Sequence, residues 1–366
     1  MKKNIISEVF FLRAIACLSI VLLHSISEVS DSGEGWIGAI RLLLAFGTPA
    51  FIIISEIVLA NAYPSHTPKG FLKKRLLFIA IPYLSFVILY SLQDLFTLSG
   101  KGNAAAHFFK NFVISLFLGE SPAYFVLIIF QFYLLHILFT RHVFNRFKPS
   151  WIVVLAGVVN VLYLAFFNLT SPPDNAIALY MWERFYRIPF LGWLFYFVVG
   201  YYLGKNYAVF LSQLNRLKYY VFALVPLTGF VSIYLLEQNI VPTLSSKRFD
   251  LILFTLSMAF MLLILASKFK TIPAFFVKIS QYSFGIYLLH PFVLSVSERF
   301  LMFENNLVRF VVLFAITLGG SVITIALINR FPWGSYIVGR VGIGLNGKKA
   351  VKQPSRVSNR SLQASE

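Results

Sequence analysis

Apolar runs of about 20 residues recur along the whole chain, and they constrain the fold more than any other feature. A run of this length lets an α-helix cross the hydrocarbon core of a bilayer. Of the 366 residues, 58% are hydrophobic and only 13% are charged, a balance that excludes an ordinary soluble domain. We therefore predict an all-α polytopic membrane protein with about ten transmembrane helices, at approximately residues 10–27, 36–60, 74–92, 122–140, 150–168, 188–205, 218–236, 250–267, 276–297 and 307–329.

The charged residues alternate between the predicted loops. One set of segments, which includes both termini, holds 22 lysines and arginines and two acidic residues. The other set holds eight lysines and arginines and eleven acidic residues. Because cytoplasmic loops carry the excess of Lys and Arg, we expect both termini to be cytoplasmic. Membrane topology then accounts for the net charge of +18, and no nucleic-acid partner is expected.

The apolar stretch 104–118 is shorter than the other runs and carries His107 and Lys110. Counting it as an eleventh span would reverse the charge alternation in every later loop, so we interpret it as interfacial or re-entrant. The transmembrane domain is expected over residues 1–344, and a basic, disordered cytoplasmic tail over 345–366. The single cysteine, Cys17, excludes an intramolecular disulfide and a cysteine-cluster metal site, and no metal is expected.

Arg13 and His24 lie inside the first apolar run, where charged and titratable residues are costly and by default mark a functional site. Eleven helical residues separate them by about 16 Å along the axis and return them to nearly the same face. In the second run, Arg41 falls near the depth of His24 and Glu56 near the depth of Arg13. We expect these runs to be antiparallel neighbours, which predicts an ion pair of Arg13 with Glu56 and places Arg41 beside His24.

Each of these groups also has a purely structural interpretation. An ion pair between Arg13 and Glu56 could fix helix packing. A lone His24 would fit an interfacial histidine that donates to a carbonyl. Beside Arg41, however, the imidazole would stay neutral and able to act as a base or a nucleophile.

Two further segments carry polar groups at membrane depth. His290 precedes Pro291 in the outer half of a predicted helix, where proline can kink the helix toward a cavity or histidine can satisfy the kink. Lys73, Lys74 and Arg75 begin the third predicted helix at its cytoplasmic side. Three cations there suit a phosphorylated ligand, although positive-inside charge alone would explain the lysines.

These segments together resemble the motifs of the acyltransferase-3 family of membrane proteins. The resembling features are Arg13 and His24 with ten residues between them, Phe46–Ser55, Arg75 with Ile81–Tyr83, and Ile286–Pro291. Two positions differ, because the family usually has glycine where this chain has Glu56, and a second arginine where it has Phe78. At these two positions the chain most resembles the branch of the family that contains the membrane protein of the poly-N-acetylglucosamine biofilm adhesin system.

The resemblance implies a multi-pass protein of the bacterial cytoplasmic membrane. It would transfer an acyl group, acetyl or succinyl, from cytoplasmic acyl-CoA to a hydroxyl of a cell-surface or lipid-linked glycan. Acyl-CoA would be a co-substrate, with no permanently bound cofactor. The implied catalytic residues are His24, Arg13, Arg41 and His290, and the implied substrate-binding residues are Arg75, Lys74 and Glu56.

In this interpretation His24 activates the acceptor hydroxyl or carries the acyl group, and Arg41 stabilises the developing oxyanion or tunes His24. The alternative is a polysaccharide exporter or flippase without chemistry, and a channel or proton-coupled transporter is a weaker third. An exporter needs a wide, continuous polar path, whereas an acyltransferase needs a narrow slot that ends at His24. The shape of the cavity should therefore separate them.

Overall fold

The computed structural model describes residues 6–30, 35–97, 103–144, 146–301 and 303–342, and this part of the chain is helical and contains no strand. The helices are α1 (Ser7–Val29), α2 (Gly35–Leu44), α3 (Gly47–Ala62), α4 (Phe71–Arg75), η1 (Leu76–Ala80), α5 (Ile81–Thr97), α6 (Ala104–Leu118), η2 (Pro122–Tyr124), α7 (Phe125–His142), α8 (Pro149–Leu169), α9 (Ala176–Arg187), η3 (Phe190–Trp193), α10 (Leu194–Lys205), α11 (Tyr207–Arg216), α12 (Lys218–Glu237), α13 (Leu251–Ala266), α14 (Ala274–Glu298), α15 (Asn306–Ile328) and α16 (Gly334–Ile337).

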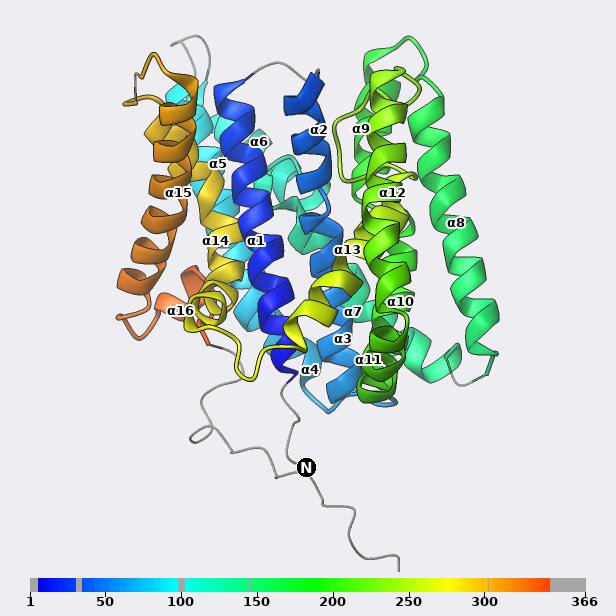
Figure 1. Ribbon diagram of the computed structural model, residues 1–366. Helices are drawn as coiled ribbons and strands as arrows, with labels where there is room; N and C mark the ends of the chain where they lie inside the picture. The colour runs from blue at the N-terminus through cyan, green and yellow to red at the C-terminus, as the bar shows by residue number, and fades with distance from the viewer. Residues whose placement is uncertain (1–5, 31–34, 98–102, 145, 302, 343–366) are drawn as a thin grey trace, which may run out of the picture.

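The helices form one bundle around α1, which runs from the N-terminal end to the opposite end (Figure 1). α1 packs against α3, α13, α14 and α15. α14 and α15 lie on one side of it, and α8 and α10 lie on the other (Figure 1). α1 therefore packs against several helices at once, and its Arg13 lines the internal cavity described below.

Seven stretches of the described chain are long and apolar enough to cross a membrane. They confirm the predicted all-α, polytopic class. The other helices that match predicted spans, α10, α13 and α14, are outside this set. The number ten and the cytoplasmic position of both termini stay predictions. The expected tail at 345–366 lies outside the described residues.

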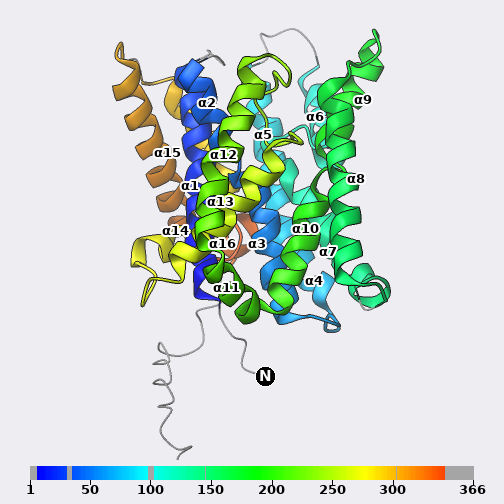
Figure 2. The same cartoon turned by 45° about the vertical axis from the view of Figure 1, so that its right-hand side comes forward.

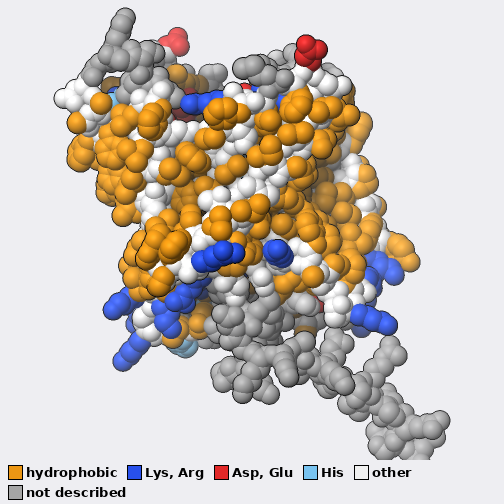
Figure 3. Space-filling view, turned by 90° about the vertical axis from the view of Figure 1, so that its left-hand side faces the viewer, with side chains coloured by type: hydrophobic (Ala, Val, Ile, Leu, Met, Phe, Trp, Pro, Cys, Tyr) orange, Lys and Arg blue, Asp and Glu red, His pale blue; other side chains and the backbone are white. Residues whose placement is uncertain are grey.

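The lysine and arginine side chains gather at one end of the bundle, here called the basic end (Figure 3). Its exposed members are Lys69, Lys73, Lys74, Arg141, Arg146, Lys148, Arg216, Lys268, Lys270, Lys278, Arg330 and Arg340. From the positive-inside rule we expect this end to face the cytoplasm.

Two of the crossings are broken near mid-depth. α6 and α9 occupy the half of the bundle away from the basic end, and α7 and α10 occupy the other half (Figure 2). The α6–α7 break receives a hydrogen bond from Tyr287, midway along α14, and the α9–α10 break receives one from Asn160, midway along α8. The stretch 104–118 is therefore the outer half of the crossing completed by α7, which explains why it adds no crossing to the charge alternation.

Side chains satisfy the backbone groups that these breaks leave without helical partners. Gln131 donates to the Ile188 carbonyl at 3.0 Å and accepts from the Phe190 N–H at 2.9 Å. Asn160 donates to the Gly192 carbonyl at 2.9 Å and accepts from the Phe195 N–H at 3.0 Å. Irregular backbone at membrane depth requires such internal partners, so the breaks are stable features of the fold.

α3 and α10 cross in close contact. Gly200 and Gly204, four residues apart on α10, lie directly against the backbone of α3 at Ile53 and Ile57. Small residues at this spacing let two helices approach closely in a membrane, where packing replaces the hydrophobic effect as the driving force. This contact fixes α3 and, with it, one wall of the cavity described below.

We predict that Gly204→Val lowers stability by at least about 1–3 kcal/mol, because a side chain there overlaps the Ile57 carbonyl and must push the helices apart. The measurement is thermal unfolding of the purified protein in detergent. Gly319→Ala is the control, since a methyl group at that position meets no atom within 4 Å. Equal melting temperatures for the two variants would show that the α3–α10 contact is unimportant.

Candidate active site

A cavity of about 280 Å³ lies between α1, α3, η1, α7 and α14. Most of its lining is aliphatic or aromatic, and its polar groups include Arg13, Arg75, Tyr133 and Tyr287. Arg75, at the end of α4, marks the side of the cavity toward the basic end. Ile20 marks the far side, one helical turn before His24 on the same face of α1. The cavity is thus a largely apolar slot that extends toward His24.

Two arginines flank Tyr133 on the wall of the slot. The Arg75 guanidinium lies 5.0 Å from the centre of the Tyr133 ring and 5.1 Å from that of Phe71. Arg13 approaches the same tyrosine closely enough for its charge to act on the hydroxyl group. None of the described carboxylates forms an ion pair with either arginine. Two uncompensated cations at the wall of an apolar slot favour an anionic ligand.

The backbone around Arg75 is widened by a π-helical turn, η1. The Ile81 N–H donates to the Leu76 carbonyl five residues earlier. Pro82, which follows directly, has no N–H to offer the Phe78 carbonyl, so the regular α-helical ladder is interrupted there. Arg75, directly before the wide turn, and Phe78, inside it, both line the cavity.

The predicted ion pair between Arg13 and Glu56 is wrong. The Glu56 carboxylate lies 2.6 Å from Nδ1 of His136 on α7, and both side chains are buried. Nε2 of His136 donates to the Tyr63 carbonyl at 3.1 Å, so one proton is shared between Nδ1 and the carboxylate. The pair is neutral overall wherever that proton lies, which lets it stay buried in the bundle. Glu56 is therefore a packing element, and Arg13 remains available to the slot.

His24 and His290 meet beyond the far side of the slot. Their ring centres are 5.3 Å apart, and the ring of Tyr287, which lines the slot, is 6.4 Å from that of His290. His24 is exposed, whereas His290 is buried. The two histidines therefore lie together, but neither they nor Arg41 line the 280 Å³ cavity, so the expectation that all three line one cavity stays a prediction.

The neighbouring proline fixes the protonation of His290. Pro291 cannot donate to the Tyr287 carbonyl, and Nδ1 of His290 lies 3.0 Å from that oxygen and 2.9 Å from the Ile286 carbonyl. Because both partners are acceptors, Nδ1 carries the proton. Nε2 is then a buried acceptor, and it has no partner among the described residues. His290 thus fits both interpretations of the sequence: its Nδ1 satisfies the carbonyl freed by the proline, and its Nε2 is available to a ligand.

Two cations adjoin His24. The charges of Arg41, on α2, and Lys247 both act on its ring, which is consistent with the expected neighbourhood of Arg41 and His24. Nζ of Lys247 lies 3.3 Å from the Tyr124 hydroxyl and 5.6 Å from the centre of the Tyr186 ring. Sequence analysis missed Lys247 because it lies in a loop between predicted spans.

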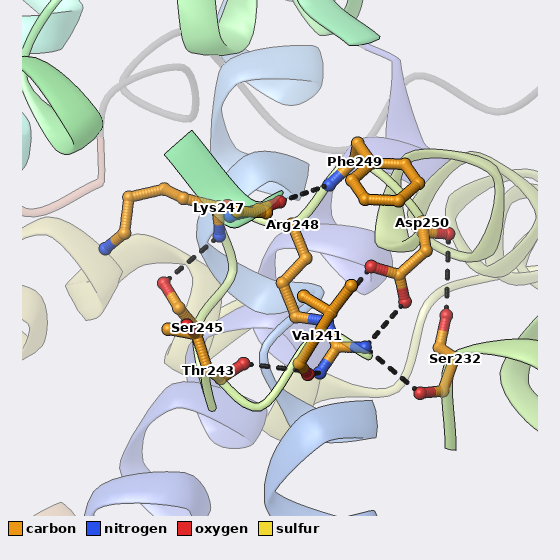
Figure 4. A network of polar contacts seen from close by, with 9 residues as sticks. Ser232, Val241, Thr243, Ser245, Lys247, Arg248, Phe249 and Asp250 are labelled. Atoms are coloured by element: carbon orange, nitrogen blue, oxygen red, sulfur yellow. Dashed lines mark hydrogen bonds and ion pairs between the residues drawn. The ribbon is translucent and has the colours of Figure 1, made fainter. Parts of the chain in front are cut away.

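A buried arginine holds the loop that carries Lys247. Arg248 forms two 3.0 Å bonds to Asp250 and donates to the Val241 and Ser232 carbonyls (Figure 4). Figure 4 also shows Lys247 extending away from Arg248, with its amine outside this network. The fully satisfied Arg248 fixes the loop, and the loop in turn holds Lys247 near His24.

The remaining predicted residue, Lys74, is exposed and does not line the slot. Of the three cations at this position, the structure brings Arg75 alone into the cavity wall. His136 is a residue that the sequence could have indicated, because a histidine inside an apolar run is the same signal that drew attention to His24.

We predict that Glu56 and His136 couple energetically and that Glu56 and Arg13 do not. Replacing each by leucine, singly and in pairs, and measuring denaturant unfolding gives both double-mutant cycles. The expected coupling is about 1–3 kcal/mol for Glu56 with His136, since losing one partner strands the other in the bundle. If Glu56 coupled more strongly with Arg13 than with His136, the originally predicted ion pair between Glu56 and Arg13 would be correct.

Comparison with known proteins places this geometry in a family. The acyltransferase domain family matches residues 7–326. A protein of Bacillus subtilis strain 168, provisionally named membrane-bound acyltransferase YfiQ, is 36% identical over 92% of this chain and 95% of its own length.

Relatives from staphylococci carry a different provisional name, poly-beta-1,6-N-acetyl-D-glucosamine export protein. The protein from Staphylococcus aureus strain Mu50 is 30% identical over 94% of this chain and 99% of its own length. The one from Staphylococcus epidermidis is 30% identical over 93% of this chain and 96% of its own length. No solved structure gives a significant match. The family match covers nearly the whole described bundle, and the chain therefore belongs to the acyltransferase-3 family of multi-pass bacterial membrane acyltransferases.

Proposed function

We propose that this protein transfers an acyl group, acetyl or succinyl, from cytoplasmic acyl-CoA to a hydroxyl of a cell-surface or lipid-linked glycan. One observation carries the proposal. An apolar slot has Arg13 and Arg75 on its wall toward the basic end, and it extends toward the paired histidines His24 and His290. A donor held at one face of the membrane can thereby meet an acceptor at the other.

The donor end of the slot suits the charge of coenzyme A. Arg75 and Arg13 face the cavity without carboxylate partners in the described chain, and guanidinium groups bind phosphates through paired N–H donors. From Arg13 to His24 is about 16 Å along α1, a distance that an extended pantetheine arm can span. The apolar wall between them suits such an arm and its thioester.

At the outer end, His24 acts as the general base. It takes the proton of the acceptor hydroxyl while the hydroxyl oxygen attacks the thioester carbonyl, and Arg41 and Lys247 stabilise the oxyanion that forms. The carbon–sulfur bond then breaks, and His24 returns the proton to the sulfur. The products are the glycan ester and the free CoA thiol. His290 accepts a hydrogen bond through Nε2 from a hydroxyl group of the acceptor and so orients it.

The names of the staphylococcal relatives refer to export of a poly-β-1,6-linked N-acetylglucosamine. We therefore propose this polymer, or a related glycan, as the acceptor. The same names support the alternative of an exporter without chemistry. The shape of the slot favours the enzyme, because a cavity of about 280 Å³ with a mainly apolar wall suits a narrow arm better than a hydrated polysaccharide.

We predict that Arg75→Ala raises KM for acyl-CoA about tenfold, because it removes a bidentate phosphate contact. Steady-state kinetics of the purified protein with labelled acetyl-CoA and succinyl-CoA would measure this. Lys74→Ala is the matched control, since this neighbouring cation is exposed and lies outside the cavity wall. Equal effects of the two substitutions would point to general surface charge and not to a donor site.

We predict that His24→Ala reduces acyl transfer by at least about 100-fold, because general-base catalysis contributes on that order or more. Ser27→Ala, on the same helix, is the control, since Ser27 only donates to a carbonyl of its own turn. In cells, His24→Ala should remove acyl groups from the surface glycan while the glycan still reaches the surface. If the glycan accumulates inside with its acylation unchanged, the exporter interpretation is correct.

A further inference from the structure

A third arginine lies at the basic end of the slot and comes from the far end of the chain. The guanidinium of Arg340, three residues beyond α16, lies 3.4 Å from the centre of the Phe78 ring, and Phe78 lines the cavity. Tyr336 stacks on the same phenylalanine, with ring centres 5.3 Å apart. The segment 334–340 therefore forms part of the rim around the basic end of the slot.

The backbone holds Arg340 in this place. Gly339 has φ +82°, a conformation that side chains disfavour, and it lies directly against the ring of Phe284, another residue of the cavity wall. Val338 before it is buried, and its carbonyl packs on Gly285 of α14. If Arg340 served only to place positive charge on the cytoplasmic side, its backbone would not need to be held in a fixed position against the cavity wall.

The stacked position leaves the hydrogen-bonding capacity of Arg340 intact. A guanidinium that lies over a ring contacts it through its face, and its five N–H donors point outward in its own plane. Among the described carboxylates, none forms an ion pair with Arg340. Arg13 on α1 and Arg75 on α4 line the slot, and Arg340 stacks on Phe78 of its wall, so three arginines without ion-pair partners among the described carboxylates lie in or against this wall.

We propose that Arg340 is a third phosphate-binding residue of the donor site, which it completes from the C-terminal side by contacting the nucleotide end of the acyl donor. This inference rests on the proposed function. A donor with several phosphate groups needs several cations, and three converging arginines provide them where a neutral thioester would need none. Phosphate groups occur both in coenzyme A and in lipid headgroups, so the test must separate these two sources.

The direct test is binding of adenosine 3′,5′-bisphosphate, a probe with the 3′-phosphate and the first 5′-phosphate of coenzyme A but no pantetheine arm. The purified, full-length protein is reconstituted in vesicles of neutral phosphatidylcholine. Arg340→Ala should raise Kd about tenfold, the loss expected for one charge-assisted contact. Arg340→Lys should keep the charge but lose the bidentate geometry, giving an intermediate Kd. Arg330→Ala is the control, because Arg330 is an exposed arginine at the same end of the bundle.

Kinetics provide a second readout. With acyl-CoA, Arg340→Ala should raise KM about tenfold and leave kcat nearly unchanged. With acylpantetheine, which lacks the nucleotide phosphates, Arg340→Ala and the unchanged protein should have equal KM values. Unchanged melting temperatures would establish that the variant is folded.

The inference is overturned if Arg340→Ala and Arg330→Ala give the same Kd while Arg75→Ala still weakens binding. It is also overturned if Arg340→Ala has an effect only when anionic lipid is added to the vesicles, since Arg340 would then bind a headgroup. If the unchanged protein neither binds the bisphosphate nor uses acyl-CoA, the proposed function itself fails, which is a distinguishable result.

Discussion

Every backbone polar group in the hydrocarbon region must find a partner inside the protein. Part of the candidate site lies where the regular helical hydrogen bonds are interrupted and backbone groups need side-chain partners. Pro291 deprives the Tyr287 carbonyl of its donor, and the histidine before it supplies one. The repair fixes the proton of His290 on Nδ1 and leaves Nε2 as a buried acceptor. At the break after α9, Gln131 and Asn160 likewise donate hydrogen bonds to backbone carbonyls that lack helical partners. At His290, the structural repair and the proposed chemical role therefore belong to the same side chain, and a mutation there would affect both.

The charged groups within the bundle divide into two kinds by whether they are compensated. Glu56 and His136 form a buried pair that is neutral overall, and Arg248 is enclosed by a carboxylate and carbonyls. Such groups hold the fold and have no remaining capacity for a ligand. Arg13 and Arg75 instead face a cavity with no carboxylate in ion-pair contact among the described residues. Compensation, more than burial, thus separates the packing residues from the candidates for binding.

Sequence analysis predicted those features that depend on one helix or on two sequence neighbours. The spacing of Arg13 and His24 follows from helix geometry, and the basic end follows from the charge of the loops. The partner of Glu56 could not be predicted, because His136 comes from α7, which is 80 residues away, and hydropathy does not report which helices are adjacent. The breaks at mid-depth were not recognised for a related reason, since Gly119, Pro122 and Pro189 are equally typical of the end of a whole span, and hydropathy does not report depth in the membrane. Arg340 was missed because its place at the slot depends on a left-handed glycine and on packing against α14.

The position of Arg340 also explains a departure noted in the sequence. The third-helix motif of the resembling family has a second arginine where this chain has Phe78, so this chain lacks one cation at that position. In the structure, the Phe78 ring supports a guanidinium that arrives from the other end of the chain. An aromatic ring and a remote arginine can together place a planar cation where a single side chain would otherwise reach. In the proposed donor site, the affinity for the donor would therefore depend on the packing of segment 334–340 against α14 and on the folding of the C-terminal part of the bundle.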